Sequence, residues 1–228
     1  MKRIVVNEEM PQFMTDKLKS LFGYEIFKCK KFNKFENAVA AHPDMNYLQV
    51  KNNLFTIYDI FDLDIKNNLK SEKLKYPKDV LLNAFCIGED FICKTDSVYI
   101  KALDYAKNIG MNIVGVNQGY VKCNLAVANE SEKAVITEDC GIYKTLKDHG
   151  YDVLLLETNS VRLDPYKYGF IGGATGNIGG KLVFTGNLLK HPEHKRIFDF
   201  CHKHKTECVS LSEDELYDYG SVLLLNLW

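Results

Sequence analysis

Glycines crowd one segment of the chain, at a spacing that could hold a phosphate. Residues 168–188, YGFIGGATGNIGGKLVFTGNL, contain seven of the fifteen glycines. A dinucleotide-binding turn needs a helix that begins inside the glycine run, because the helix N-terminus supplies the amides that meet the pyrophosphate. The turn from Gly173 to Gly179 is instead followed by KLVFT, which is typical of a strand. The segment predicts a hairpin, and a nucleotide-dependent enzyme is the less favoured interpretation.

Residue types that bind metals gather in a second segment, nearer the C-terminus. It holds His191, His194, Cys201, His202, His204 and Cys208. In a helix, His194 and Cys201 would share a face two turns apart, whereas His202 and His204 would diverge. None of the closed zinc spacings is met. We expect a basic surface helix here and no bound metal.

The composition argues against partners that recognise overall charge. Lys and Arg number 29 against 30 Asp and Glu, and this net charge of −1 predicts binding to neither nucleic acid nor a membrane surface. No secretory signal and no run of about 18 apolar residues is present. Seven cysteines without a C-x-x-C pair favour reduced thiols in the cytosol. We expect a cytoplasmic protein with a single domain over residues 1–228. The sequence does not decide whether it forms a homodimer.

One order of elements recurs along the chain. Residues 121–156 read as strand, polar turn, strand, a helix capped by Asp139 and an apolar strand. Residues 79–116 and 169–211 repeat this order, and in the latter we expect Ile197, Phe198 and Cys201 to face inward. A copy that begins at His42 becomes irregular in the polar residues 59–75, and a further copy is split between residues 220–225 and 3–29.

Each of these units, about 46 residues long, has too little apolar surface to fold alone. Neighbouring units must therefore pack together, and a unit divided between the two ends of the chain makes a closed ring the natural arrangement. The sequence predicts an α/β fold of five β-β-α-β units, one of them closed by the N- and C-termini.

A ring of five such units resembles the pentein fold of the guanidino-group modifying enzymes, which include arginine and agmatine deiminases, amidinotransferases and dimethylarginine hydrolases. The strings HPDMN, GYVKCN, ITEDCGIYKTLKDHGYDVLLL and GFIGGATG are also similar to those of an uncharacterised bacterial family assigned to that fold. The resemblance spans nearly the whole chain. It implies a five-fold pseudosymmetric α/β propeller that takes a small-molecule ligand in its central channel and modifies a guanidino or amide group without a cofactor.

The resemblance also implies a catalytic set. In the pentein enzymes, a His of an H-x-D motif and a Cys two units later act at the channel, and His42, Asp44 and Cys123 stand in that order here. Cys123 would attack the guanidinium carbon and His42 would protonate the leaving amine, while Asp44 orients His42 or binds the guanidinium. The familiar enzymes carry their Cys near the C-terminus, whereas the corresponding strand after Tyr219 has none.

Four residues near the starts of neighbouring units are expected to bind the substrate: Asp218, Asn124, Gly172 and Gly173. Ionisation of the Cys123 thiol would need a pKa lowered by Lys122, by His42 or by a cationic substrate. Structural roles stay open for the same residues. Cys123 alternates with apolar neighbours as a core cysteine on a strand would, His42 and Asp44 could open and cap a turn, and Asp218 between two tyrosines is typical of a solvated loop. A non-catalytic pentein-fold binding protein is therefore the main alternative function.

Overall fold

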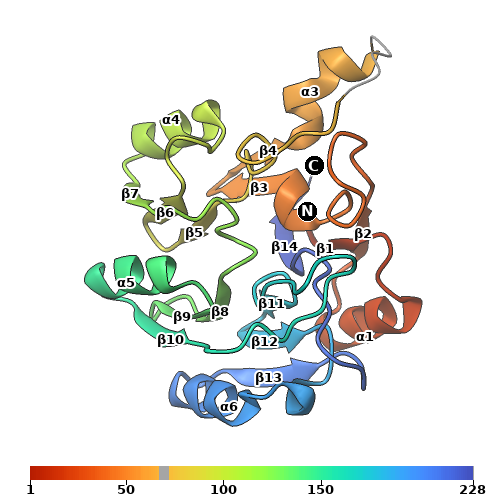
Figure 1. Ribbon diagram of the computed structural model, residues 1–228, viewed down its shortest axis with the longest axis vertical. Coiled ribbons are helices and arrows are strands. Elements are labelled where there is room, and N and C mark those ends of the chain that lie inside the picture. The colour runs from red at the N-terminus through yellow and green to blue at the C-terminus, as the bar shows by residue number, and fades with distance from the viewer. Residues whose placement is uncertain (67–71, 228) are drawn as a thin grey trace.

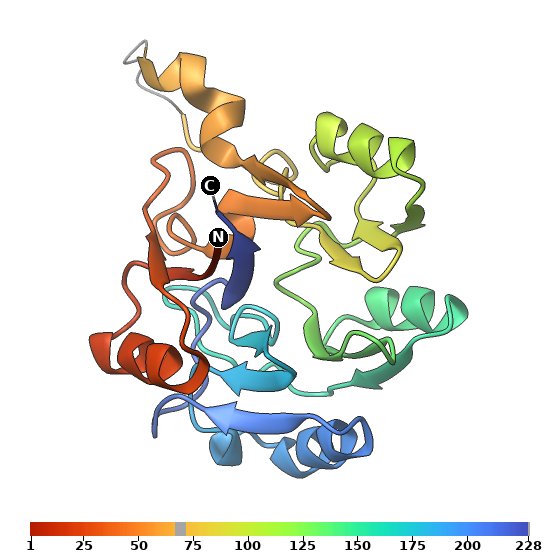
Figure 2. The same cartoon turned by 180° about the vertical axis from the view of Figure 1, so that it is seen from behind.

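The strands of the protein form small separate sheets with the helices on the outside (Figure 1). The structure is a computed structural model and describes residues 1–66 and 72–227. Within these residues there are five sheets, in the strand orders β14-β1-β2, β3-β4, β5-β6-β7, β8-β9-β10 and β11-β12-β13. The view from behind in Figure 2 shows the strands toward the middle of the molecule and the helices at its edge. No helix in the described part of the chain is both long and apolar enough to cross a bilayer.

The elements have the following bounds. The strands are β1 (Lys2–Asn7), β2 (Ile26–Cys29), β3 (Tyr47–Val50), β4 (Asn53–Thr56), β5 (Phe85–Ile87), β6 (Asp90–Cys93), β7 (Asn112–Gly115), β8 (Ala126–Asn129), β9 (Ala134–Thr137), β10 (Asp152–Leu155), β11 (Thr175–Ile178), β12 (Lys181–Phe184), β13 (Glu207–Ser210) and β14 (Leu223–Asn226). The helices are α1 (Gln12–Phe22), α2 (Pro43–Asn46), α3 (Ile57–Lys66), α4 (Ile100–Asn108), α5 (Cys140–Asp148), the 3₁₀ turn η1 (Leu188–Lys190) and α6 (His194–Lys203).

The predicted order of strands and helix recurs in the sheets. β8 pairs antiparallel with β9, β9 pairs parallel with β10, and α5 connects these last two strands. The sheets β5-β6-β7 and β11-β12-β13 have the same pattern of one antiparallel and one parallel pair, and α4 and α6 connect their parallel strands. In β14-β1-β2, the C-terminal strand pairs antiparallel with the N-terminal one, which confirms that the two ends of the chain share a unit. The polar residues 59–75 begin in helix α3, and residues 67–71 lie outside the described residues.

The glycine segment is a hairpin, as the sequence predicts. β11 pairs antiparallel with β12, and the pair Ile178–Lys181 closes a two-residue turn. Its residues, Gly179 and Gly180, both have positive φ, at 59° and 79°, which is the conformation that tight hairpin turns need and that glycine adopts without strain. A strand follows the turn, so the helix N-terminus that a phosphate loop needs is not provided here.

The helices cover the sheets through narrow apolar stripes. Asp139 caps α5 by accepting a hydrogen bond from the Ile142 amide at 2.8 Å, as predicted. In α6, the prediction that Phe198 faces inward was wrong: its exposed fraction is 38%, whereas Ile197, Phe200 and Cys201 are buried. Positions i, i+3 and i+4 share a helix face and position i+1 lies about 100° away, which explains the difference.

The first strands of the units begin later than predicted. Residues 121–124 form a helical turn, in which the Asn124 amide donates to the Tyr120 carbonyl at 3.1 Å, and β8 starts only at Ala126. A turn also precedes β3, as helix α2, and another precedes β11, where the Ala174 amide donates to the Phe170 carbonyl at 3.2 Å. The predicted strand alternation around Cys123 was therefore wrong. The first strands of the five units are called the inner strands below: β3, β5, β8, β11 and β14. Side chains from the turns that precede them lie close together.

Candidate functional site

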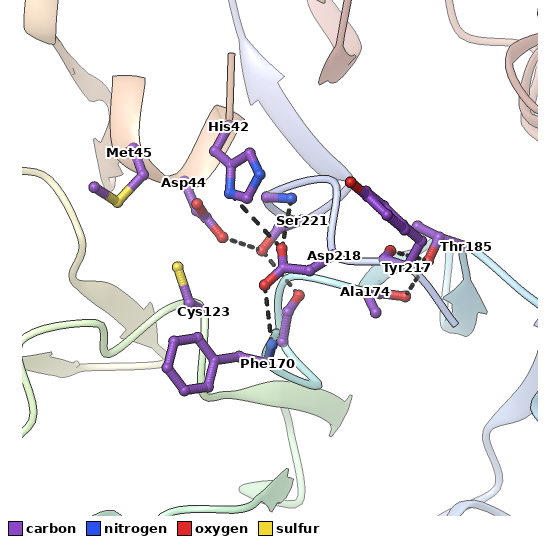
Figure 3. A network of polar contacts seen from close by, with 12 residues as sticks. His42, Asp44, Met45, Cys123, Phe170, Ala174, Thr185, Tyr217, Asp218 and Ser221 are labelled. Atoms are coloured by element: carbon purple, nitrogen blue, oxygen red, sulfur yellow. Dashed lines mark hydrogen bonds and ion pairs between the residues drawn. The ribbon is translucent and has the colours of Figure 1, made fainter. Parts of the chain in front are cut away.

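The turns before the inner strands bring a group of buried polar residues together (Figure 3). Each turn contributes: His42 and Asp44 before β3, Asn83 before β5, Lys122 and Cys123 before β8, Gly172 and Gly173 before β11, and Asp218 and Ser221 before β14. The exposed fraction of each of these residues other than the two glycines is 6% or less. Burying so many ionisable groups costs free energy unless they are paired, and such groups gather at functional sites.

Asp218 lies at the centre of this group. One carboxylate oxygen, Oδ2, accepts a hydrogen bond from the Phe170 amide at 2.9 Å, and the other, Oδ1, accepts one from the Gly220 amide at 2.9 Å. Oδ1 is also 3.7 Å from Nδ1 of His42. Burial raises the pKa of Asp218 to about 6, although both amides oppose this shift. The expectation of a solvated loop residue was wrong, and Asp218 provides a buried carboxylate beside His42.

His42 and Asp44 each have a buried polar atom without a partner among the described residues, namely Nε2 of His42 and Oδ1 of Asp44. The other oxygen of Asp44 accepts a hydrogen bond from the Ser221 hydroxyl at 2.7 Å. Burial lowers the pKa of His42 and raises that of Asp44. His42 is therefore neutral near pH 7 and can take up a proton at Nε2.

Cys123 is held by Asn83. The Asn83 side-chain amide donates to the Cys123 sulfur at 3.0 Å, and its oxygen accepts from the Lys122 backbone amide at 2.7 Å. Burial raises the pKa of Cys123, and the charges of Asp44 and Asp218 raise it further, whereas Asn83 lowers it. The thiol is thus protonated in the unliganded protein. Of the three influences expected to lower its pKa, a cationic substrate is the one that would cancel the two carboxylates.

Lys122 is a buried cation close to the same group. Its Nζ donates to the Ser221 hydroxyl at 3.2 Å and to the Leu125 carbonyl at 3.3 Å, and lies 5.0 Å from the centre of the Phe85 ring. Burial lowers the pKa of Lys122. The Ser221 hydroxyl links the ammonium to Asp44 without a direct contact. The positive charge of Lys122 lowers the pKa of Asp44 and so opposes the effect of burial.

Glycines let the turns approach one another. A Cβ at Gly173 would lie 2.0 Å from Oδ1 of Asp218, and one at Gly172 would lie 2.4 Å from the Lys122 carbonyl. A Cβ at Gly220 would lie 2.2 Å from the His42 side chain. No side chain fits at these distances, so glycine is required for the turns to meet.

A cavity of about 430 Å³ opens onto this group of residues, and His42, Cys123 and Asp218 all line it. The other residues that line it are Glu36, Val39, Met45, Asp79, Tyr120, Leu163, Tyr166, Lys167, Tyr168 and Phe170. Cys123 and His42 therefore share one cavity. Four of the predicted site residues are not among its lining residues within the described chain: Asp44, Asn124, Gly172 and Gly173. The Asn124 side-chain amide instead donates to the Tyr120 carbonyl at 2.8 Å.

Two residues of this group carried no expectation from the sequence: Asn83 and Ser221. Both stand in turns that precede inner strands, as His42 does, so alignment of the repeated units was the signal that could have found them.

The His and Cys residues of segment 191–208 are arranged differently. His191 and His204 are buried, at 3% and 5% exposure, so the prediction of a surface segment was wrong for both. His204 lies between two carboxylates, with Nδ1 2.6 Å from Glu132 and Nε2 3.0 Å from Asp152. In the part of the chain that the structure describes, no three His, Cys, Asp or Glu side chains are grouped as a metal ion would require.

The fold is the mixed α/β fold of pentein structures. The chain is similar to DDAH from Pseudomonas aeruginosa, at 7% identity and a TM-score of 0.56, over 92% of this chain and 91% of that one. It is also similar to a dimethylarginine dimethylaminohydrolase adduct with S-methyl-L-thiocitrulline, at 8% identity and a TM-score of 0.55, over 93% of each chain. A family model described as "Family of unknown function (DUF6873)" matches residues 5–223, and the chain belongs to this family. No curated protein matches the sequence.

Proposed function

We propose that this protein is a Cys-dependent hydrolase or transferase that acts on a guanidino or amide group of a small molecule. Cys123 is the nucleophile, His42 moves the proton and Asp218, which lines the cavity, holds the cationic group. Asp44 is a second buried carboxylate, whose charge favours the protonated form of His42. The single observation that carries the proposal is the cavity that Cys123, His42 and Asp218 share. A fold does not by itself specify a function, so the site and not the fold is the basis of the proposal.

The charges of the site suit a cationic group. Asp218 lines the cavity 3.7 Å from His42, Asp44 is a second buried carboxylate whose charge interacts with His42, and a guanidinium can donate paired N–H bonds to a carboxylate. Once a cation is bound there, it opposes the two charges that raise the pKa of Cys123. Substrate binding would thus favour the thiolate, and a free thiol would stay protected when the cavity is empty.

The reaction then proceeds in two balanced steps. The thiol proton passes to Nε2 of His42, the sulfur bonds to the central carbon, and the imidazolium returns the proton to the departing amine as the C–N bond breaks. Water, or an acceptor amine in a transferase, attacks the covalent intermediate and gives a proton to His42, and the imidazolium passes this proton to the Cys123 sulfur as the C–S bond breaks. Cys123 and His42 are regenerated. The Asn83 amide, 3.0 Å from the sulfur, stabilises the thiolate in both steps.

The remaining residues have supporting roles in this proposal. Gly172 and Gly173 allow the turns that carry Cys123 and Asp218 to pack together, and Asn124 holds the Cys123 turn through Tyr120. We further propose that the chain is one domain, with the five sheets arranged as a five-fold pseudosymmetric propeller around the cavity.

A library of guanidino and amide compounds tests the function. Cys123→Ala should lower turnover of any active compound by at least about a thousandfold, because the covalent step is lost. Cys140→Ala is the matched control, since Cys140 is an exposed thiol at the start of α5. Equal activity of the two variants would sink the proposal. Ligand binding without turnover in the native protein would instead identify a non-catalytic pentein-fold binding protein.

A further inference from the structure

The outer part of the site cavity is acidic. Glu36 and Asp79 line it in addition to Asp218, and Lys167 is the one lining residue with a full positive charge in the part of the chain that the structure describes. A cavity with three carboxylates and one ammonium attracts cations and repels anions. The charge of the ligand as a whole is therefore constrained, beyond its reacting group.

The two outer carboxylates share the cavity lining with Tyr166. Burial first, and then Glu36 and Asp79, raise the pKa of Tyr166, so both carboxylates act on its hydroxyl. Asp79 also accepts a hydrogen bond from the Tyr120 hydroxyl at 2.6 Å through Oδ2, while its Oδ1 is buried without a partner among the described residues. An acceptor of this kind is satisfied when a ligand donates to it.

Aromatic rings form the adjoining wall. The Tyr120 and Phe170 rings are stacked, with centroids 6.0 Å apart and planes at 29°, and the Tyr168 ring meets Phe170 edge-on at 6.3 Å. Tyr76, which is not a lining residue, packs on Tyr120 at 5.8 Å. Ring faces attract ammonium and guanidinium groups and also pack on the methylenes of an alkyl stem.

A carboxylate on the ligand would find the single ammonium of Lys167 among three lining carboxylates at this end. Recognition of a carboxylate is the usual task of an arginine, whose planar fork makes two hydrogen bonds. No arginine lines the cavity within the described residues. Arg162 pairs instead with Asp164, at 3.1 Å on the surface.

We propose that Glu36, Asp79, Tyr120 and Tyr166, which we call the rim, bind a second cationic group of the ligand. The substrate is then a guanidino compound with an amine, and not a carboxylate, at its far end, joined by an apolar stem that lies on the aromatic wall. This inference rests on the proposed function for the inner end of the cavity.

A matched set of ligands isolates the end group: butylguanidine, aminobutylguanidine and guanidinobutyrate. Binding is measured by calorimetry to the Cys123→Ser variant, which cannot turn the ligands over. Aminobutylguanidine should bind at least about tenfold more tightly than butylguanidine, because it gains the rim carboxylates, and guanidinobutyrate should bind most weakly.

Variants of the rim carboxylates then test whether Asp79 and Glu36 cause the tighter binding of aminobutylguanidine. Asp79→Asn and Glu36→Gln should each remove most of the advantage of aminobutylguanidine while leaving butylguanidine within about twofold. Asn at position 79 keeps an acceptor for Tyr120, and thermal unfolding of each variant checks that the fold is retained. Asp164→Asn, an exposed carboxylate outside the cavity, is the control and should change nothing.

The outcomes separate this inference from the proposed function. Equal binding of butylguanidine and aminobutylguanidine, or tightest binding of guanidinobutyrate, would overturn the rim assignment and leave the guanidino site standing. An ammonium advantage that persists in both rim variants would also overturn it. Failure of all three compounds to bind, together with no binding of other guanidino compounds, would remove the proposed function itself.

Discussion

The two ends of the inner strands differ in how their polar groups are satisfied. At the end where the strands begin, the cavity of Cys123 is lined by groups with unpartnered buried atoms, including those of His42 and Asp79. At the other end, a second cavity of about 360 Å³ is lined by Gln49, Lys51 and Asn177, among others. There the Asn177 amide donates to the Val127 and Ala128 carbonyls, at 3.0 and 2.9 Å, and Lys51 pairs with Glu89 at 2.8 Å.

This contrast indicates which end has been shaped for a ligand. Satisfied polar groups at the far end hold neighbouring sheets together. Unsatisfied buried groups at the near end destabilise the empty protein and would be completed by a bound cation. Lys122 belongs to both ends, because it lines the far cavity while its ammonium bonds to Ser221 beside Asp44.

The largest expected difference between the two ends is in activity. His42→Ala should lower turnover by about a hundredfold or more, because the proton carrier is lost, and added imidazole should restore part of it. Asn177→Ala, at the far end, should leave turnover within about twofold and cost about 1–2 kcal/mol of unfolding free energy through its lost hydrogen bonds. Steady-state kinetics check both variants, and equal losses at the two ends would break the comparison.

A second comparison is between two glycines of the segment 168–188, Gly173 at the near end and Gly180 in the hairpin turn, as sites for alanine substitution. Gly173→Ala should cost about 3 kcal/mol of unfolding free energy, since its Cβ would overlap the Asp218 carboxylate. Gly180→Ala should cost only about 1 kcal/mol, because its φ of 79° strains alanine although no atom lies within 4 Å of the added carbon. Urea unfolding measures both. A smaller loss at Gly173 than at Gly180 would show that the turns are not tightly packed.

A smaller effect concerns pH. Burial raises the pKa of Asp218 from its ordinary 3.8 to about 6, so the folded protein holds this proton more tightly than the unfolded chain. The contribution to stability is full below about pH 4 and is lost as the pH rises through about 6, on the order of 3 kcal/mol in all. Asp218→Asn should flatten this part of the stability curve, and the exposed Asp164→Asn should not. An unchanged slope in Asp218→Asn would mean that Asp218 does not titrate in this range.

Local patterns in the sequence were enough to predict the hairpin at Gly179, the cap at Asp139 and the pairing of the two termini. They were not enough to place the starts of the inner strands. The alternation around Cys123 fits a strand and a helical turn equally well over so few residues, and only packing against the neighbouring turns decides between them. The exposure of Phe198 was missed because two adjacent residues of a helix point about 100° apart, so Phe198 cannot share the buried face of Ile197 and Cys201.

The site was predictable to the extent that residue types mark chemistry. His42, Asp44, Cys123 and Asp218 do lie together, but the burial of Asp218 and the roles of Asn83 and Ser221 depend on contacts between residues far apart in the chain. The direction of the Cys123 pKa likewise follows from burial between two carboxylates, which no local pattern contains.

The central claim is that a bound cation converts the protonated Cys123 thiol into a nucleophile. The most direct measurement is the rate at which Cys123 is alkylated at pH 7 by cationic chloroacetamidine and by neutral chloroacetamide, followed by peptide mass mapping in a Cys140→Ser background. We expect chloroacetamidine to modify Cys123 at least about tenfold faster relative to a free thiol in solution, and Asp218→Asn to reduce this preference. Equal relative rates for the two reagents, or no modification of Cys123 without unfolding, would contradict the account.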